Sequence, residues 1–393
     1  MTTKKLQRSD LAVHGGSPAF AEAIHVGRPN IGDRERLFSR INDLLDRRWL
    51  SNNGKYVVEF ERRVAETISV AHCVAMSNAT ASLEIAIRAL GLSGEVLVPS
   101  FTFVATVNAL QWHGLTPVFC DIDLASHTID FRAAERRITP RTTGILGVHL
   151  WGHPCSIDQL ADLAKRHNLK LLFDASHAFG CSYKKRMIGN FGNAEVLSFH
   201  ATKFLNTFEG GAIVTNDDDL ASKVRLMRNH GFSGLDEVAC VGTNAKMSEV
   251  SAAMGITGLE SLEDFVAINR RHYEQYQQEL SGIPGISLVP YNEDKRCNYQ
   301  YVVIEVDAEQ ARITRDDLVR ILRAENVFAR RYFFPACHRM QPYLRLYPEA
   351  GKFLPNTETL SERVLCLPTG TALNSPDITT ICQIIRLALG FDL

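Results

Sequence analysis

The chain has 393 residues, nine cysteines and a formal net charge of −1 at pH 7. A nearly neutral chain without a basic run does not favour a nucleic-acid or membrane-surface role, and no apolar stretch approaches the roughly 18–20 residues that a membrane-spanning helix needs. The polar amino-terminal residues contain no secretory core. The scattered cysteines form no CxxC pair, which predicts reduced thiols and a cytoplasmic protein.

The first residues differ from the rest. Residues 1–30 contain Gly and Pro turn signals and are predicted to form an arm rather than a core element. Residues 33–48 follow the helical period and are predicted to place four apolar side chains on one face, namely Leu37, Ile41, Leu44 and Leu45.

Short apolar runs and helical segments then alternate. Strands are predicted at 73–76, 95–98, 117–122, 145–150, 171–175 and 196–199, and helices at 80–90, 102–112, 157–167 and 220–227. This alternation predicts an α/β fold whose central sheet is mostly parallel and flanked by helices, with ligands beyond the carboxyl ends of the strands. Residues 211–215 follow a turn too short for a crossover, so they are predicted to be an antiparallel edge or return strand.

The pattern changes after about residue 250. Helices are predicted at 248–259, 265–280, 318–324 and 377–389, and strands at 301–306 and 327–333. The long helix 265–280 is expected to link two domains. We therefore predict a large domain of residues 31–260 and a smaller α+β domain of residues 261–393, preceded by the arm.

Two charged residues stand in or beside predicted buried strands. Lys203 lies in a turn of small and polar residues, where a lysine is paired, solvated or chemically used. Asp174 ends a predicted buried strand, where a carboxylate can keep the ring nitrogen of a pyridinium cofactor protonated. Taken alone, Lys203 is typical of a surface loop, and Asp174 of a helix N-cap or a salt bridge.

Residues 77–81 are small and polar and lie between a predicted strand and a predicted helix. They suit an anion held by the first amides of that helix, with the Thr80 hydroxyl as a further donor. The alternative is simple capping of the helix by Ser77, Asn78 or Thr80. Phe103 opens another predicted helix and suits either stacking on a cofactor ring or a place in the core.

Other constellations are less specific. His149, His153 and Cys155 have a spacing that zinc ligands use, but they fall in a predicted strand end and turn, so a cofactor-pocket wall is favoured and no metal is expected. Cys337 beside His338 could be a nucleophile, but packing or sugar contact is favoured because no supporting third group is identified. The sequence has no phosphate-binding loop of the Walker A type and no convincing GxGxxG.

Several motifs together resemble one known family. They are D-x-x-H at 174–177, S-x-H-A-x-K at 198–203, E-G-G at 209–211, W-L-S-N-N-G at 49–54, S-N-A-T-A at 77–81, P-S-F-T-F at 99–103 and G-T-N-A-K-M-S-E at 242–249. The set is similar to that of the nucleotide-sugar aminotransferases of the DegT type. These enzymes have fold type I and depend on pyridoxal 5′-phosphate (PLP), and the resemblance extends over nearly the whole chain.

The resemblance implies a catalytic set of Lys203, Asp174 and His177. Lys203 would form a Schiff base with PLP and, once freed, move protons. Asp174 would hold the ring nitrogen protonated, while Phe103 and His177 would flank the ring. Related sugar 3-dehydratases have a histidine at the lysine position, so Lys203 favours transamination.

The resemblance also implies how the cofactor phosphate is held. Thr80, Ala81 and Ser198 would bind it within one subunit, and Asn244 would reach it from the partner subunit. A homodimer with the active site at the subunit interface is therefore expected.

Substrate contacts are implied for Lys246, Arg330, Tyr332 and His338. The Arg330–Arg331 pair suits a diphosphate or an ordinary surface. The implied reaction moves an amino group from glutamate, with glutamine open, to C4 of dTDP-4-keto-6-deoxy-D-glucose. The alternatives are a GDP-4-keto-6-deoxymannose 4-aminotransferase of the perosamine type, a sugar 3-aminotransferase, and a non-catalytic PLP-binding regulator.

Overall fold

The computed structural model describes residues 3–292 and 294–391. Its centre is a seven-stranded sheet in the order β2-β10-β9-β6-β5-β3-β4. The strands are β2 (His72–Met76), β3 (Glu95–Pro99), β4 (Thr116–Cys120), β5 (Thr142–Val148), β6 (Lys170–Asp174), β9 (Ala194–Ser198) and β10 (Gly211–Thr215).

The sheet confirms the predicted α/β fold, with one difference in the place of a strand. Only β10 runs against its neighbours, since it pairs antiparallel with both β2 and β9 while the remaining pairs are parallel. Residues 211–215 are therefore a return strand, as predicted. They lie inside the sheet rather than at its edge, because β2 from the start of the domain adds on the outer side of β10.

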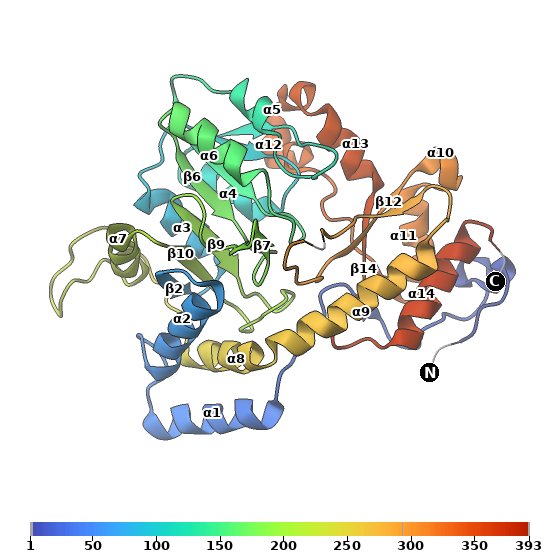
Figure 1. The fold of residues 1–393 in the computed structure, drawn as a ribbon, viewed down its shortest axis with the longest axis horizontal. Coiled ribbons are helices and arrows are strands. Elements are labelled where there is room, and N and C mark those ends of the chain that lie inside the picture. Colours follow the sequence, from blue (N-terminus) through green and yellow to red (C-terminus); the bar gives the residue numbers. More distant parts are fainter. Residues whose placement is uncertain (1–2, 293, 392–393) are drawn as a thin grey trace.

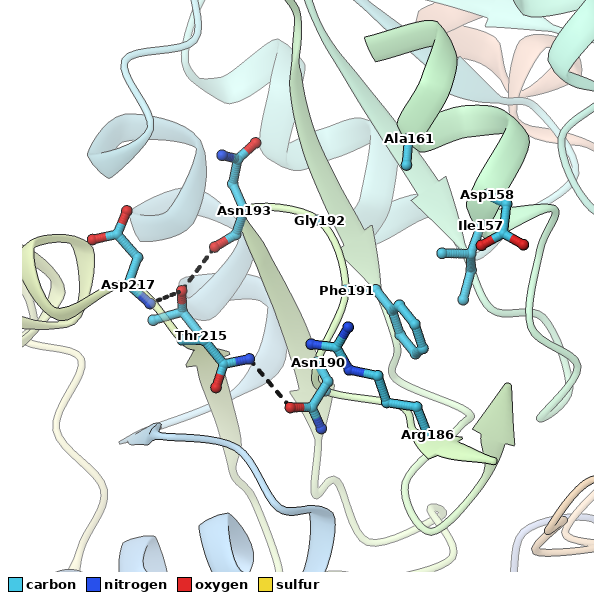
Figure 2. A pocket seen from close by; sticks show the side chains of 12 residues that line it. Ile157, Asp158, Ala161, Arg186, Asn190, Phe191, Gly192, Asn193, Thr215 and Asp217 are labelled. Atoms are coloured by element: carbon cyan, nitrogen blue, oxygen red, sulfur yellow. Dashed lines mark hydrogen bonds between the residues drawn. The ribbon is translucent and has the colours of Figure 1, made fainter. Parts of the chain in front are cut away.

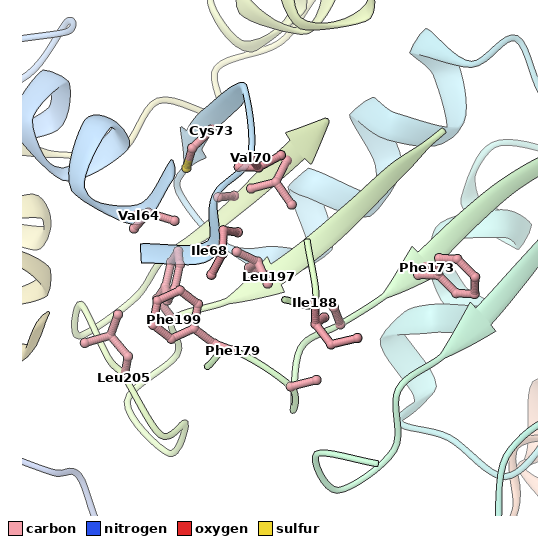
Figure 3. Packing of buried hydrophobic residues seen from close by; sticks show 14 of the residues in the cluster. Val64, Ile68, Val70, Cys73, Phe173, Phe179, Ile188, Leu197, Phe199 and Leu205 are labelled. Carbon is pink, nitrogen blue, oxygen red and sulfur yellow. The ribbon is translucent and has the colours of Figure 1, made fainter. Parts of the chain in front are cut away.

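Helices cover both faces of this sheet (Figure 1). One face packs against α2 (Lys55–Ile68), α6 (Ile157–Arg166) and α8 (Glu249–Glu260), and the other against α3 (Ala79–Ala89), α4 (Val104–Trp112) and α7 (Asp218–Arg228). Successive strand residues point to opposite faces: Leu171 and Phe173 join the first core, and Leu172 joins the second. Figure 3 shows the first core, where Ile68 of α2 packs near Leu197 and Phe199.

A smaller unit follows around a three-stranded antiparallel sheet. Its elements are α9 (Leu262–Leu280), β11 (Ile286–Leu288), β12 (Val302–Val306), α10 (Ala308–Ala311), α11 (Arg315–Ala324), β13 (Val327–Phe328), α13 (Pro355–Arg363), β14 (Val364–Leu367) and α14 (Ser375–Ala388). The same part of the chain contains α12 (Gln341–Leu346), whose Tyr343 instead lies in the second core of the large sheet. Helix α9 joins the two parts (Figure 1): Phe265 lies in the core of the large sheet, whereas Tyr276 and Leu280 lie in the core of the small one. The prediction of a linking helix is confirmed, and the domain limits at residues 30 and 260 stay predictions.

Part of the amino-terminal segment belongs to the small unit's core, so the expectation that residues 1–30 are an arm rather than a core element is wrong for Leu11, Ala19, Phe20 and Ile24. Leu11, Phe20 and Ile24 are buried with the side chains of α11 and α14. The short strand β1 (Ile24–His25) pairs in parallel with β13. Isolated apolar residues among turn signals carry no period that reveals this docking.

The packed face of one helix and the length of one strand also differ from expectation. Helix α1 (Arg34–Arg47) begins after its N-cap Asp33 and buries Leu37 and Leu44, but Leu45 is 54% exposed instead of lying on the packed face. The strand predicted at 327–333 is regular only over Val327–Phe328. The following residues leave the sheet pairing, and Arg330 makes a single bridge to Cys366.

The remaining short elements are α5 (Phe131–Glu135), β7 (Ser182–Tyr183), β8 (Arg186–Met187) and four 3-10 turns at Arg8–Asp10, Ala12–His14, Cys337–Arg339 and Ala350–Phe353. Across residues 3–292 and 294–391, none of the helices combines the length and apolarity that a bilayer span requires.

Candidate active site

A cavity of about 420 Å³ opens beside the carboxyl ends of β6 and β9. Of the predicted site residues, the ones that line it are Thr80, Phe103, Asp174, His177, Ser198, Lys203, Arg330 and Tyr332. They come from segments more than 250 positions apart in the sequence, and the sheet brings them together where parallel strands end. Ala81, Asn244, Lys246 and His338 do not line the cavity.

Lys203 stands in the turn between β9 and β10, where its backbone amide donates to the His200 carbonyl at 2.8 Å. Loss of hydration in the cavity wall lowers the pKa of the Lys203 amine to about 8, and the negative charge of Asp174 opposes that shift. A substantial fraction of the amine is therefore neutral near pH 8, and only the neutral form is a nucleophile.

Asp174 ends β6 and is buried. Each carboxylate oxygen has one donor: the Thr106 hydroxyl donates to Oδ2 at 2.8 Å, and the Ser176 amide donates to Oδ1 at 3.1 Å. The Asp174 carbonyl accepts from the His149 amide at 2.9 Å, which fixes the strand end against β5. A carboxylate oxygen has two lone pairs, so Asp174 keeps acceptor capacity for a group in the cavity.

His177 is a neutral ring with a defined tautomer. The backbone amide of Trp151 donates to its Nδ1 at 3.2 Å, so in the neutral ring the proton resides on Nε2. Burial, together with the charge of Lys203, holds the His177 pKa well below its ordinary value. The His177 ring lies parallel to Phe333 at 5.9 Å between centroids and 4.5 Å from Tyr301, so its plane is held by packing.

The first turn of α3 meets the cavity at Asn78, Ala79 and Thr80. Of the three candidate caps, Asn78 is the one used, since its Oδ1 accepts from the Ala81 amide at 2.8 Å. The Ala81 amide is therefore already engaged by the Asn78 side chain. The Ala79 and Thr80 amides lie in the first turn, where the helix itself supplies no acceptor. These amides, with the Thr80 and Ser198 hydroxyls, form a donor set suited to a phosphate.

The chemistry of this donor set fits PLP. Lys203 supplies an amine of lowered pKa, Asp174 a buried carboxylate with spare acceptor capacity, and the α3 terminus an anion site. Flat faces are offered by His177 and by Phe103, whose ring is 54% exposed and lies 6.2 Å from Phe333. A phosphorylated pyridine aldehyde needs each of these features.

The predicted substrate residues divide into two groups. Arg330 and Tyr332 line the cavity, with the guanidinium 5.2 Å from the Tyr332 ring centre. Arg331 instead pairs with Asp316 at 3.0 Å, and it does not line the cavity.

The other two lie apart from the cavity. His338 is buried with both ring nitrogens engaged, Nδ1 with Ser100 at 2.7 Å and Nε2 with Glu358 at 2.8 Å. The Lys246 amine donates to Asn229 at 3.0 Å. Asn244 is exposed in this chain, which leaves it accessible to a second subunit.

The histidine and cysteine constellations serve packing. His149 lines the cavity wall as favoured above, stacked on Phe173 with its Nε2 3.2 Å from Glu195. His153 instead stacks on Tyr291 at 4.6 Å. Within the described residues no three His, Cys, Asp or Glu side chains form a metal-binding group. Burial raises the Cys337 pKa to about 12, so its thiol is inert.

A second cavity, of about 540 Å³, lies at the opposite ends of β6 and β9 (Figure 2). Its polar groups already bond to one another: Thr215 Oγ1 donates to the Asn193 carbonyl at 2.8 Å, and the Asn216 side chain donates to Asn190 at 3.2 Å. None of the predicted site residues lines it.

Some residues of the site were missed by sequence reasoning. Thr106 does not line the cavity but donates to Asp174, and it follows Phe103 by three positions, so helical spacing was a usable signal for it. Gln300, Tyr301 and residues 25–27 line the cavity itself. They come from distant segments in which no motif marks them.

Comparisons with known proteins identify the family of this chain. The profile of the DegT/DnrJ/EryC1/StrS aminotransferase family matches residues 32–386. A dTDP-4-amino-4,6-dideoxy-D-glucose transaminase of Shigella dysenteriae is 37% identical over 92% of this chain and 98% of its own. A GDP-perosamine synthase of Caulobacter vibrioides is 33% identical over 91% of this chain and 96% of its own.

The solved structures include DesI, determined in the presence of its TDP-sugar product. It is 48% identical, with a TM-score of 0.93, and the match covers 97% of this chain and 96% of that one. Aminotransferases of this family depend on PLP, which is the cofactor that the cavity fits. The chain is a nucleotide-sugar aminotransferase and belongs to the DegT/DnrJ/EryC1/StrS aminotransferase family.

Proposed function

We propose that this enzyme transfers the amino group of glutamate to C4 of dTDP-4-keto-6-deoxy-D-glucose and so forms dTDP-4-amino-4,6-dideoxy-D-glucose. The observation on which the proposal rests is the Lys203 amine of lowered pKa in one cavity with the Asp174 carboxylate. The substrate is supported by the 37% identical relative named for this product, and by DesI, whose structure was determined with a TDP-sugar product.

In this proposal PLP, attached through Lys203, supplies an electrophilic carbon for the amino group and a ring that accepts the electron pair released when a proton leaves the donor's α-carbon. Once the incoming amino group has displaced Lys203 from the cofactor, the freed Lys203 amine would remove that proton and return it to the cofactor's reacting carbon, because the amine is neutral in part near pH 8. Asp174 would hold the ring nitrogen protonated. His177, which is neutral and accepts a hydrogen bond from the Trp151 amide, would flank the ring together with Phe103.

The phosphate of the cofactor would rest on Thr80, Ser198 and the first turn of α3, to which Ala81 belongs. For the substrates, Arg330 and Tyr332 are the proposed contacts within the subunit. Lys246 and Asn244 lie apart from this cavity, so their proposed contacts are with the site of the partner subunit in a homodimer.

The exposed apolar side chains support a homodimer. Trp49 and Leu50 follow α1, Val58 lies on α2, and Phe38 and Leu45 lie on α1; each of the five is about half exposed. A cluster of large apolar side chains facing water is typical of a subunit interface. Leu235 and Val241, at 98% and 67% exposure, lie in the segment that projects beyond α7 (Figure 1).

A two-stage experiment tests the reaction. Purified holoenzyme is mixed with glutamate alone, and both the change in its visible spectrum and the formation of 2-oxoglutarate are followed. The keto sugar is then added, and the product is identified by mass spectrometry and NMR, which locates the new amine at C3 or C4. A non-catalytic regulator would leave the spectrum unchanged by glutamate and by glutamine.

A second candidate is a GDP-linked 4-keto sugar, favoured by the 33% identical GDP-perosamine synthase. The same second stage, run with GDP-4-keto-6-deoxymannose at equal concentration, compares the two. A kcat/KM at least tenfold higher for the GDP sugar would overturn the dTDP assignment while leaving transamination intact.

A further inference from the structure

The Asp174 carboxylate is not free to turn. Thr106 is fully buried on α4 and directs its hydroxyl at Oδ2 of Asp174 over 2.8 Å, while the Ser176 amide meets Oδ1. Both donors favour the ionised carboxylate, because hydrogen bonds to the charged form stabilise it in a buried place. The carboxylate plane is thereby fixed from two sides.

The direction of the bond beyond Thr106 follows from counting protons. Thr102 Oγ1 lies 3.0 Å from Thr106 Oγ1. An ionised carboxylate only accepts, so the single hydroxyl proton of Thr106 is committed to Asp174. The bond between the two threonines must then run from Thr102 to Thr106. When two hydroxyls donate in the same direction, each polarises the other, and the final hydrogen bond, here from Thr106 to Asp174, becomes stronger.

Of these two hydrogen-bonded threonines, one belongs to the cavity wall and the other does not. Thr102 lines the cavity, whereas Thr106 does not and reaches it only through Asp174. The aromatic residue between them, Phe103, caps α4 and also lines the cavity. One turn of α4 therefore supplies both a flat face for the ring and the support for the carboxylate.

We propose that Thr106 is a positioning residue of this aminotransferase: supported by Thr102, its hydroxyl orients the Asp174 carboxylate and holds it ionised toward the ring nitrogen of the cofactor. The proposal rests on the proposed role of Asp174. Without the Thr106 donor, the Asp174 carboxylate loses the contact that holds Oδ2 in place and pairs less well with the ring nitrogen, so less electron withdrawal reaches the carbon where the substrate reacts.

The test uses the full-length holoenzyme and three variants. Thr106→Val keeps the shape and removes the donor, Thr106→Ser restores the donor, and Thr102→Val removes only the bond that supports Thr106. For Thr106→Val we expect kcat of the glutamate half-reaction to fall about 10- to 100-fold, the range found when a residue that orients a functional group by a hydrogen bond is removed. The KM for glutamate should change less than about threefold.

A spectroscopic readout separates this role from simple packing. The pH at which the visible band of the holoenzyme titrates, measured without substrate, should move upward by about half a unit or more in Thr106→Val. Thr106→Ser should return both kcat and the titration midpoint close to the original values. Thr102→Val should move them in the same direction by a smaller amount.

The outcomes are decisive in each case. If Thr106→Val keeps the original kcat and midpoint, or if Thr106→Ser behaves like Thr106→Val, the proposal is overturned. Should Thr106→Val fail to fold, Thr102→Val decides, and an unchanged midpoint there overturns it. Failure of the proposed function is distinguishable, because the unaltered enzyme would then show no reaction with glutamate.

Discussion

A lysine in water stays protonated up to about pH 10, yet Lys203 has to react as a neutral amine. The structure resolves this conflict by partial burial, which lowers the pKa of Lys203 to about 8 even though Asp174 acts in the other direction. This lowered pKa sets the direction in which stability changes with pH, because the folded chain loses the Lys203 proton at a lower pH than the unfolded chain does. The Lys203 contribution to the free energy of unfolding therefore rises as pH increases from about 8 toward about 10.4.

Lys203 offers a direct test at this scale. The rate at which cofactor-free protein captures PLP covalently should increase with pH and reach half its maximum near about 8, because only the neutral amine reacts. Borohydride reduction followed by peptide mass spectrometry measures capture at Lys203, with Lys203→Arg as the unreactive control. Exposed Lys185 provides an internal comparison for adducts formed elsewhere. A midpoint near 10 at Lys203 would contradict the shifted pKa.

At the scale of elements, the site depends on the contact between β10 and the first turn of α3. Gly211 opens β10 opposite Met76 and Ser198. A methyl group on its Cα would come within 2.6 Å of the Ala79 amide nitrogen and the Asn78 carbonyl carbon. Only a residue without a side chain allows the helix terminus to approach the sheet this closely.

Gly211→Ala should therefore displace the amides proposed to hold the cofactor phosphate. We expect PLP to dissociate more readily and the free energy of unfolding to fall by about 1–3 kcal/mol, because backbone atoms cannot rotate away as a side chain can. Equilibrium dialysis measures retention of PLP, and denaturant unfolding of the cofactor-free protein measures stability. Gly234→Ala is the control, since its nearest neighbour would lie 3.6 Å away. Equal retention in the two variants would refute the close-contact argument.

At the scale of the whole molecule, the amino-terminal segment is tied to the small unit by buried polar contacts. Glu325 is fully buried, accepts from the Ala12 and Ala19 amides at 2.6 and 2.7 Å, and lies 3.3 Å from the buried Lys5 amine. The same segment continues to His25 and Gly27, which line the cavity. Glu325 thus connects the folding of the first residues with the shape of the site.

Glu325→Ala should leave the buried Lys5 ammonium without its carboxylate partner and with only the Asp10 and Ser17 carbonyls as acceptors, a change that costs about 3–5 kcal/mol. Thermal and denaturant unfolding measure the loss, and limited proteolysis should cut the amino-terminal segment earlier than in the unaltered protein. Adding Lys5→Met to Glu325→Ala should recover part of the stability. If the double variant is as unstable as the sum of the single changes, the buried ion pair is not the cause.

The proposed dimer gives a complementation test. Lys203→Ala and Asn244→Ala should each lack most activity as homodimers, for different reasons. In a mixed dimer, one site would combine an intact Lys203 with an intact Asn244 from the other subunit, so mixing the two inactive proteins should restore activity. Unfolding and refolding the mixture allows subunits to exchange, and each variant treated alone is the control. No recovery in a mixture that contains mixed dimers would place Asn244 outside the partner's site.

The sequence alone determined the α/β alternation, the linking helix and the family, because periodicity and motifs are local properties of the chain. It also marked Lys203, Asp174, His177, Phe103, Thr80 and Ser198, which line one cavity. The tertiary structure decided the rest. The docking of the amino-terminal segment involves Glu325, which lies more than 300 positions from Ala12 and Ala19 in the chain. The place of β10 inside the sheet depends on pairing with β2.

The same reason explains the residues on which the sequence was silent or misleading. The role of Thr106 depends on its hydrogen bond to Asp174, which forms only when α4 packs beside β6. His338 does not contact the cavity as expected, because Ser100 and Glu358 bind its two ring nitrogens. The Lys203 pKa is likewise a property of its surroundings. Residue types and local spacing are encoded along the chain, whereas burial, pairing and the direction of a proton exist only once distant segments meet.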